Sequence, residues 1–215
     1  MLDRRSLGVY VVTSNDLYPG RTHRHVALAA IEGGASAIQL RAPELDDRDL
    51  LPLATELAGL CREAGVVFVV NDRLDVALLS GADGVHLGQG DDLDQARSRI
   101  GENGALGISV NDAEEAGAAE AAGADYLGVT VWATSTKPEA VPLDLEGLRA
   151  IVGATTLPVV GIGGIQAANA WQVIHAGATG VAVVSAVAAA EDPVDATRKL
   201  AAAVRTAAST RGGSS

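Results

Sequence analysis

Several short apolar runs of this 215-residue sequence are followed at once by polar or charged side chains. Asp72 comes directly after the run 66–71, and Asp91 comes four residues after the run 84–87. Carboxylates from two separate loops suit Mg²⁺, which takes one or two such ligands and completes its shell with water and substrate phosphate. The pair therefore predicts a Mg²⁺ site. The alternative, compatible with the first, is that Asp72 and Asp91 cap the helices that follow them.

Two cations at the same ends of these runs are candidates for binding an anion. Arg41 closes the otherwise apolar run 37–41, where an uncompensated charge is costly and a guanidinium suits a bidentate grip on phosphate or diphosphate. A structural ion pair with an internal acid is the alternative. Lys137 follows Thr134 and Thr136, so one loop carries a cation and two hydroxyls. That loop predicts an anion clamp, and ordinary solvated loop composition explains it equally well.

Glycines at positions 161, 163 and 164 lie between an apolar run and a helical pattern. Backbone N–H groups at such a helix start form an anion site. The alternative is a tight turn that needs a positive φ angle. A dinucleotide-binding fingerprint is rejected, because it needs a third glycine at position 166, which is Gln166.

Nucleophilic catalysis is not indicated. His86 is the one histidine near these run ends, and a histidine there is more often a hydrogen-bonded structural residue than a base. Cys61 lies inside a helical pattern without a basic neighbour to activate it. No Ser/His/Asp arrangement is evident.

The elements that must position these residues alternate along the chain. Short runs rich in β-branched residues alternate with longer stretches of helical pattern, and the runs are mostly continuous, which is typical of parallel strands buried on both faces. Asn111 and Glu114 have the spacing of a capping box at one helix start. We expect strands at 8–13, 37–41, 66–71, 84–87, 105–109, 126–131, 157–161 and 180–184, and helices at 46–64, 111–122, 144–152, 167–176 and 193–208. Units of about 27 residues predict an α/β fold, a single (β/α)8 TIM barrel, with its chemistry at the carboxyl ends of the strands.

A four-fold repeat supports the barrel. Gly–Ala followed by Ser, Asp or Thr recurs at 34–36, 81–83, 123–125 and 177–179, about two units apart. Each glycine is expected just past a helix end, where a positive φ angle is needed, and each triplet opens a strand. A repeated βαβα unit fits a closed barrel better than an open sheet. We predict one domain over 1–210 and a disordered tail over 211–215.

Composition limits the partners. The formal net charge of −11 disfavours nucleic acids and anionic membranes as main partners. One cysteine leaves no intrachain disulfide, and no apolar run approaches the roughly 20 residues of a membrane span. We expect a cytoplasmic protein with small-molecule partners, and the Ala-rich helices are compatible with a homo-oligomer.

Nearly the whole chain resembles the thiamine-phosphate synthase family, which belongs to the thiamine monophosphate synthase and thiazole tautomerase superfamily. The matching segments are Gln39–Leu40–Arg41, Val70–Asn71–Asp72–Arg73, Gly81–Gln89, Asp91, Gly107–Ile108–Ser109, Ala124–Asp125–Tyr126, Thr134–Ser135–Thr136–Lys137 and Gly161–Ile165. Each segment is short, but their order and spacing together are highly specific. The resemblance implies a transferase of thiamine biosynthesis that joins 4-amino-2-methyl-5-(diphosphooxymethyl)pyrimidine to a thiazole phosphate, giving thiamine phosphate and pyrophosphate.

The resemblance also implies roles for residues at the matching positions. Asp72 and Asp91 would hold Mg²⁺. The pyrimidine diphosphate would be bound by Gln39, Arg41, Asn71, Ser109 and Lys137, of which Arg41, Ser109 and Lys137 would be catalytic. The thiazole phosphate would be bound by Thr134, Thr136, Gly164, Val184 and Ser185. In that family the pyrimidine leaves as a stabilised cation before the thiazole nitrogen attacks, which agrees with the absence of an evident base.

Three positions depart from the family pattern. Pro43 stands where a lysine is usual, so one diphosphate cation is missing, at a cost of about 1.5–3 kcal/mol, or tenfold and more in binding. The segment 128–133 lacks the usual Gly–Pro and is one residue shorter, and Asn111–Asp112 stands where His–Thr is common. Arg48 is one candidate to replace the missing cation.

Two other functions remain open. A thiazole tautomerase shares the architecture, but it would need a base such as His86 and no metal. A non-catalytic barrel that binds a phosphorylated metabolite is the third hypothesis. The pair Asp72 and Asp91 together with the Thr–x–Thr–Lys segment favours the synthase.

Overall fold

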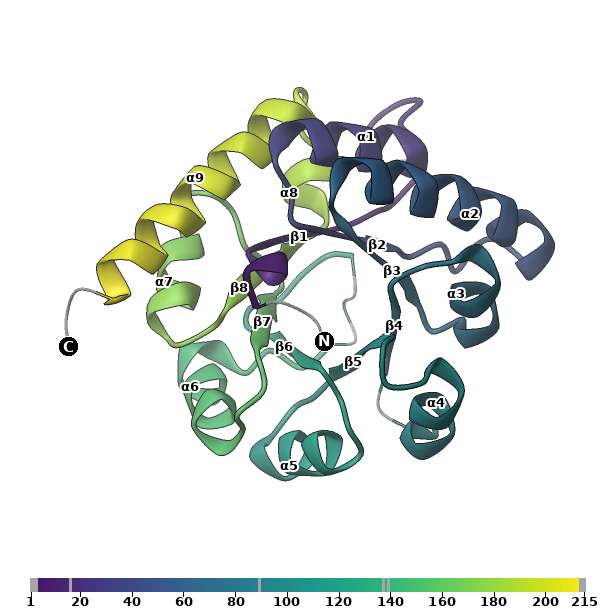
Figure 1. Cartoon of the computed structure of the whole chain (residues 1–215). Coiled ribbons are helices and arrows are strands. Elements are labelled where there is room, and N and C mark those ends of the chain that lie inside the picture. The colour runs from purple at the N-terminus through teal and green to yellow at the C-terminus, as the bar shows by residue number, and fades with distance from the viewer. Residues whose placement is uncertain (1–3, 16, 89, 137, 139, 213–215) are drawn as a thin grey trace.

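The computed structural model describes residues 4–15, 17–88, 90–136, 138 and 140–212 as a closed barrel of eight parallel strands with helices around it (Figure 1). Each strand pairs with the next in chain order, and the ring closes where Val9 and Val11 of the first strand pair with Val181 and Val183 of the last. The strands are β1 Val9–Val12, β2 Ala37–Leu40, β3 Val67–Asn71, β4 Gly84–Leu87, β5 Ala105–Ser109, β6 Tyr126–Thr130, β7 Val159–Ile162 and β8 Gly180–Val183. The predicted (β/α)8 TIM barrel is confirmed, with every predicted strand present.

The helices form the outer layer in Figure 1, and α9 lies across the outside between α7 and α1, which closes the layer. They are the 3-10 helix η1 Arg4–Leu7 and the α-helices α1 His23–Gly33, α2 Asp47–Ala64, α3 Leu74–Ser80, α4 Leu93–Ile100, α5 Ala113–Ala121, α6 Asp144–Ala154, α7 Ala170–His175, α8 Ser185–Ala188 and α9 Pro193–Gly212. Among the described residues, no helix is both long enough and apolar enough to cross a membrane.

Both faces of the strands are buried, which explains the continuous apolar runs. Alternate side chains point to opposite sides of a strand. Val9 and Val11 of β1 belong to the large core between the barrel and its helices, whereas Tyr10 between them belongs to a small second core. This second core is made of Leu7, Tyr10, Ala37, Val69, Tyr126, Val160 and Ala182. The barrel interior is thus a separate, small core that contains two tyrosines.

The Gly–Ala repeat is confirmed as a helix-to-strand junction. Its glycines have φ angles of 87° at Gly34, 73° at Gly81, 82° at Gly123 and 110° at Gly177. In three of the four copies the third residue adds a second contact, because its side chain accepts a hydrogen bond from a backbone N–H of the preceding strand. These bonds are Val9 N to Ser36 Oγ at 2.9 Å, Phe68 N to Asp83 Oδ2 at 2.8 Å and Leu106 N to Asp125 Oδ2 at 2.8 Å.

Several predicted boundaries differ from the observed ones, by one to four residues; the largest differences are the start of α7, predicted at 167 and observed at Ala170, and the end of α9, predicted at 208 and observed at Gly212. The capping box does not start at Asn111, because Asp112 is the N-cap of α5 and its Oδ1 accepts a hydrogen bond from Glu115 N at 2.8 Å. Helix α9 continues to Gly212, so the predicted tail begins too early at 211. The side chain of Arg211 donates to the carbonyl oxygens of Ile174 and Ala178, each at 2.8 Å, which holds this end of the helix against α7. Residues 213–215 lie outside the described chain.

Candidate active site

A cavity of about 140 Å³ opens at the carboxyl end of the barrel. Its wall contains every predicted substrate-binding residue that the structure describes, namely Gln39, Arg41, Asn71, Ser109, Thr134, Thr136, Gly164, Val184 and Ser185. These residues come from the ends of six different strands and the loops after them, so the closed ring of strands brings them together. Lys137 lies outside the described residues, and its predicted role stays a prediction.

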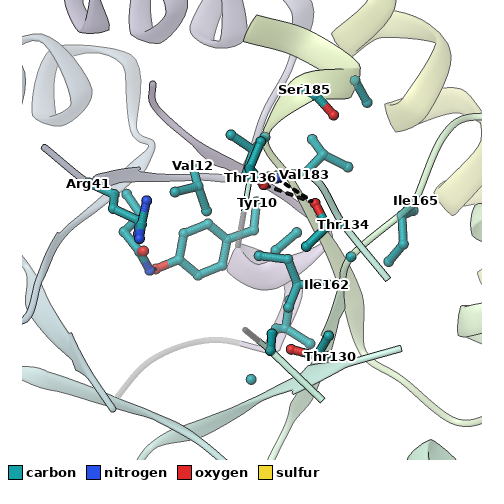
Figure 2. A pocket seen from close by; sticks show the side chains of 18 of the residues that line it. Tyr10, Val12, Arg41, Thr130, Thr134, Thr136, Ile162, Ile165, Val183 and Ser185 are labelled. Carbon is teal, nitrogen blue, oxygen red and sulfur yellow. Dashed lines mark hydrogen bonds between the residues drawn. The ribbon is translucent and has the colours of Figure 1, made fainter. Parts of the chain in front are cut away.

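The polar groups of the cavity divide between two sides. Figure 2 shows Arg41 on one side of the Tyr10 ring and Thr134, Thr136 and Ser185 on the other. The Oγ1 atoms of Thr134 and Thr136 are 2.9 Å apart and share a hydrogen bond, and the backbone N–H of Thr136 donates to Thr134 Oγ1 at 3.3 Å. The two hydroxyls therefore form one compact polar group opposite the guanidinium.

Arg41 lies directly after β2, half-buried in the cavity wall. It forms no ion pair with any acid in the described part of the chain. For those residues, the predicted alternative of a structural ion pair is wrong. Arg48 does not line the cavity, since it lies exposed on α2. A half-buried guanidinium without an acidic partner is a ready site for an anionic ligand.

The glycines after β7 make a tight turn. Gly163 and Gly164 have φ angles of 94° and 61°, and a Cβ atom on Gly163 would lie 2.2 Å from the carbonyl oxygen of Trp132. The turn interpretation is therefore confirmed. The glycines do not open a helix, because α7 begins only at Ala170. Gly164 nevertheless lines the cavity, and a Cβ atom on it would lie 3.3 Å from the carbonyl oxygen of Ala133, the residue before Thr134, so its backbone is placed to approach a ligand.

Asp72 and Asp91 line a separate groove beside the cavity. This groove, which we call the acidic groove, is lined by Asp47, Asp72, Arg73, Leu74, Asp75, Val76, Leu87, Asp91, Asp92, Gln95, Ala96 and Arg99. The cavity and the acidic groove meet at the end of β3, where Asn71 lines the first and Asp72 lines the second. The two carboxylates therefore lie in a groove of their own, next to the cavity that holds the predicted substrate-binding residues.

The capping alternative for the two aspartates is wrong. The N-cap of α4 is Asp92, whose Oδ1 accepts a hydrogen bond from Gln95 N at 2.9 Å, while Asp91 Oδ2 accepts one from Gly88 N at 2.9 Å. Arg73 occupies the N-cap position of α3, and no side chain caps that helix. Both carboxylates are therefore placed by loops and not by helix ends.

Asp72 has an unusual backbone conformation, with a φ angle of 60°. Positive φ angles are uncommon outside glycine, and such strained residues cluster at functional sites. The conformation is held by hydrogen bonds on both sides of the residue: Asp72 N donates to His86 O at 2.9 Å, and Leu74 N donates to Asp72 O at 3.1 Å. The position of Asp72 is thus tied directly to strand β4.

The donor set of the acidic groove fits Mg²⁺. Asp72 and Asp91 are both exposed and offer carboxylate oxygens from two loops. Among the described residues, no group of three or more His, Cys, Asp or Glu side chains forms a complete metal site. A pair of carboxylates that leaves room for water and phosphate is the arrangement that Mg²⁺ usually takes.

His86 connects the cavity wall to the barrel interior. Its Nδ1 lies 3.1 Å from the hydroxyl of Tyr126, and its Nε2 lies 3.0 Å from Oγ of Ser109. His86 is therefore hydrogen-bonded at both ring nitrogens, as predicted. Cys61 is also inert as expected, since it is buried in α2 and burial raises the pKa of its thiol to about 12.

Tyr10 and Tyr126 line the cavity, and sequence analysis missed both. Their hydroxyls are 2.8 Å apart, and each ring is almost wholly buried. The chain has only three tyrosines, and these two occupy strand positions that face the barrel interior. A polar aromatic residue in a strand that is buried on both faces was the available signal, because a buried hydroxyl needs a partner.

A closed parallel barrel with a polar cavity and an acidic groove at the carboxyl ends of its strands defines a (β/α)8-barrel enzyme. Residues 9–187 match the family model of thiamine monophosphate synthase, and the chain belongs to that family.

Relatives with curated names agree over nearly the whole length. The thiamine-phosphate synthase of Chloroflexus aurantiacus is 52% identical over 200 residues, which cover 91% of this chain and 92% of that protein. The thiamine-phosphate synthase of Natronomonas pharaonis is 47% identical and covers 93% of this chain and 96% of that protein. The solved structure of a thiamine phosphate pyrophosphorylase from Pyrococcus furiosus superposes with a TM-score of 0.87 at 42% identity, covering 95% of this chain and 98% of that one.

Proposed function

We propose that this barrel is a Mg²⁺-dependent thiamine-phosphate synthase. It joins 4-amino-2-methyl-5-(diphosphooxymethyl)pyrimidine to a thiazole phosphate and releases pyrophosphate. The observation that carries the proposal is a cavity with a guanidinium on one side and a pair of threonine hydroxyls on the other, beside a groove of carboxylates. Two phosphorylated substrates need such separate anion-binding sides and space for their rings between them.

The pyrimidine diphosphate is assigned to the side of Gln39, Arg41, Asn71 and Ser109. Arg41 grips the diphosphate from the end of β2, and Asn71 lies where the cavity meets the acidic groove. This junction lets a diphosphate bound in the cavity extend toward Asp72. Lys137 is proposed as a second cation on the leaving group.

The thiazole phosphate is assigned to the other side. Thr134 and Thr136 offer hydroxyl donors, while Gly164 after β7 and Val184 and Ser185 at the start of α8 after β8 offer backbone and side-chain donors. Phosphate sites of barrels frequently lie at these two loops. The assignment places the thiazole ring near Tyr10, facing the pyrimidine.

Catalysis would proceed by positioning and charge stabilisation. The C–O bond to the diphosphate breaks with its electron pair on the leaving oxygen, and the thiazole nitrogen donates its lone pair to the resulting pyrimidine cation. Held by Asp72 and Asp91, Mg²⁺ would neutralise charge on the leaving diphosphate. Arg41 and Lys137 stabilise the same charge, and the cavity wall holds the two rings in contact. No protein base is needed, because the new C–N bond forms without loss of a proton.

A pyrophosphate-release assay tests the proposal. Both substrates are mixed with the protein, with Mg²⁺ and with EDTA, and pyrophosphate is measured. We expect release that requires both substrates and Mg²⁺. Absence of metal-dependent release would overturn the proposal. Thiazole isomerisation that survives EDTA and is lost in His86→Gln would favour the tautomerase, and tight binding of thiamine phosphate without turnover would favour a non-catalytic barrel.

The proposal also extends to partners and location. The expected partners are the two small phosphorylated substrates, in the cytoplasm, and the enzyme is proposed to be a homo-oligomer. Light scattering on the purified protein would measure the oligomeric state.

A further inference from the structure

A row of hydrogen bonds crosses the barrel interior, and all the residues that form it line the cavity. Gln39 Nε2 of β2 donates to the Tyr10 hydroxyl of β1 at 3.0 Å, and that hydroxyl lies 2.8 Å from the hydroxyl of Tyr126 on β6. The Tyr126 hydroxyl lies 3.1 Å from His86 Nδ1 on β4, and His86 Nε2 lies 3.0 Å from Ser109 Oγ on β5. We call these five residues the interior chain. Both of its ends, Gln39 and Ser109, line the cavity.

The direction of every bond in the interior chain follows from its first member. Within the described residues, the Tyr10 hydroxyl has two hydrogen-bonding partners, Gln39 and Tyr126. Because the Gln39 amide nitrogen can only donate, Tyr10 accepts from it and gives its own proton to Tyr126. Tyr126 then donates to His86 Nδ1, and a neutral imidazole that accepts at Nδ1 carries its proton at Nε2. His86 therefore donates to Ser109 Oγ.

The surrounding backbone leaves room for this chain. A Cβ atom on Gly107 would lie 2.1 Å from Cζ of Tyr126 and 2.5 Å from Nδ1 of His86. A Cβ atom on Gly128 would lie 3.1 Å from Cε1 of His86. Glycines thus stand at the two places where a side chain would collide with the interior chain.

The two tyrosines remain neutral links. Burial raises the pKa of Tyr10 to about 12 and raises the pKa of Tyr126 well above its ordinary value. Both hydroxyls therefore keep their protons near neutral pH, and each accepts one hydrogen bond and donates another while it stays uncharged. A buried row of satisfied hydrogen bonds of this kind is rigid and has one preferred direction.

We infer that the interior chain is a positioning device that sets the hydrogen-bonding character of both of its ends in the cavity. With its amide nitrogen on Tyr10, Gln39 presents its carbonyl oxygen to a ligand as an acceptor. With Oγ accepting from His86, Ser109 presents its O–H to the ligand as a donor. An aminopyrimidine carries an exocyclic amine that donates and ring nitrogens that accept. One acceptor at Gln39 and one donor at Ser109 therefore select an aminopyrimidine ring, and this part of the inference rests on the proposed function.

The tautomer of His86 tests the direction of the interior chain in the protein without substrate. Protonated and unprotonated imidazole nitrogens differ widely in ¹⁵N chemical shift, so ¹⁵N NMR of the full chain at about pH 8.5 distinguishes them. We expect the Nε2–H tautomer in the wild type. In Gln39→Glu, the ionised carboxylate can only accept from Tyr10, so every bond reverses and His86 changes to the Nδ1–H tautomer. The ¹³C shift of the introduced carboxyl reports whether it is ionised.

A second substitution shows whether Gln39→Glu changes the His86 tautomer through the interior chain or by a local effect. In the double variant Gln39→Glu with Tyr126→Phe, the tautomer is expected to equal that of Tyr126→Phe alone. His175 at the end of α7, which bonds Thr210 of α9, is the internal control and keeps its signals in every folded variant. The Nδ1–H tautomer in the wild type would overturn the inference, and so would an unchanged tautomer in Gln39→Glu with an ionised carboxyl. Failure of pyrophosphate release would instead count against the proposed function alone.

Discussion

The cavity and the acidic groove adjoin at Asn71–Asp72, yet they are built in opposite ways. In the cavity, Gln39 and Ser109 lie on strands and are held by neutral hydrogen bonds that reach into a buried core. In the acidic groove, the carboxylates of Asp72 and Asp91 are exposed and lie on loops. The difference follows from desolvation, because a buried unpaired carboxylate is far more costly than a buried hydrogen-bonded amide or hydroxyl. The buried hydrogen bonds of the cavity suit recognition of a neutral ring, whereas the exposed carboxylates of the groove lie where water reaches, as a metal ion with a partly aqueous shell would require.

Removing one carboxylate from the acidic groove is expected to have the largest effect. Asp91→Asn should lower kcat on the order of a hundredfold or more with Mg²⁺ present, because several kcal/mol of charge stabilisation are lost. Asp92→Asn is the matched control, since it removes an equal charge one residue away and keeps a side chain able to cap α4. Equal losses in the two variants would show that the groove acts only through its total charge.

Removing the cavity cation is expected to have the next largest effect. Arg41→Met should raise KM for the pyrimidine diphosphate about tenfold or more, because a charge-assisted hydrogen bond contributes about 1.5–3 kcal/mol. KM for the thiazole phosphate should stay unchanged, because Arg41 lies on the opposite side of Tyr10 from Thr134 and Thr136. Arg48→Met on the exposed face of α2 serves as the control. A rise in both KM values would contradict the division of the cavity into two sides.

Removing one hydroxyl from the interior chain should lower the stability of the fold. Tyr126→Phe leaves the buried Tyr10 and the half-buried His86 each short of a hydrogen bond and is expected to lower the free energy of unfolding by about 1–3 kcal/mol. Urea denaturation measures the change. Tyr18→Phe, at a half-exposed tyrosine outside the barrel interior, should change stability by less than about 0.5 kcal/mol. A Tyr126→Phe variant as stable as Tyr18→Phe would mean that the interior hydrogen bonds contribute nothing net.

The smallest expected effect concerns Glu44, on the loop between the cavity strand β2 and helix α2. Burial by itself raises the pKa of Glu44, but hydrogen bonds from His23 and Asn15 and the charge of His23 outweigh it, so the pKa lies below its ordinary value of 4.5. A depressed carboxyl pKa stabilises the fold above the unfolded value and loses that contribution as the pH falls through the folded value. The difference in Tm between wild type and Glu44→Gln should therefore shrink from neutral pH to about pH 3.5. A constant difference would show that the charge of Glu44 contributes nothing.

Prediction from sequence succeeded where the determining interactions are local. The continuous strand runs and the Gly–Ala junctions follow from backbone burial and from the positive φ angles of Gly34, Gly81, Gly123 and Gly177. Helix caps were predicted less well, since Asp92 and Asp112 cap their helices where Asp91 and Asn111 were expected. Adjacent Asp and Asn residues are equally able to cap, and only the path of the loop decides which one does.

The sequence by itself determined the eight βα units, the polar residues at the strand ends and the family, because these depend on residue order and hydrophobic pattern. Only the tertiary structure decided that the substrate residues share one cavity while Asp72 and Asp91 lie in a neighbouring groove. It also decided that Tyr10 meets Tyr126, 116 residues away in the chain. The physical reason is closure: pairing β8 with β1 places opposite strands face to face across the barrel, and no local pattern encodes which side chains then touch.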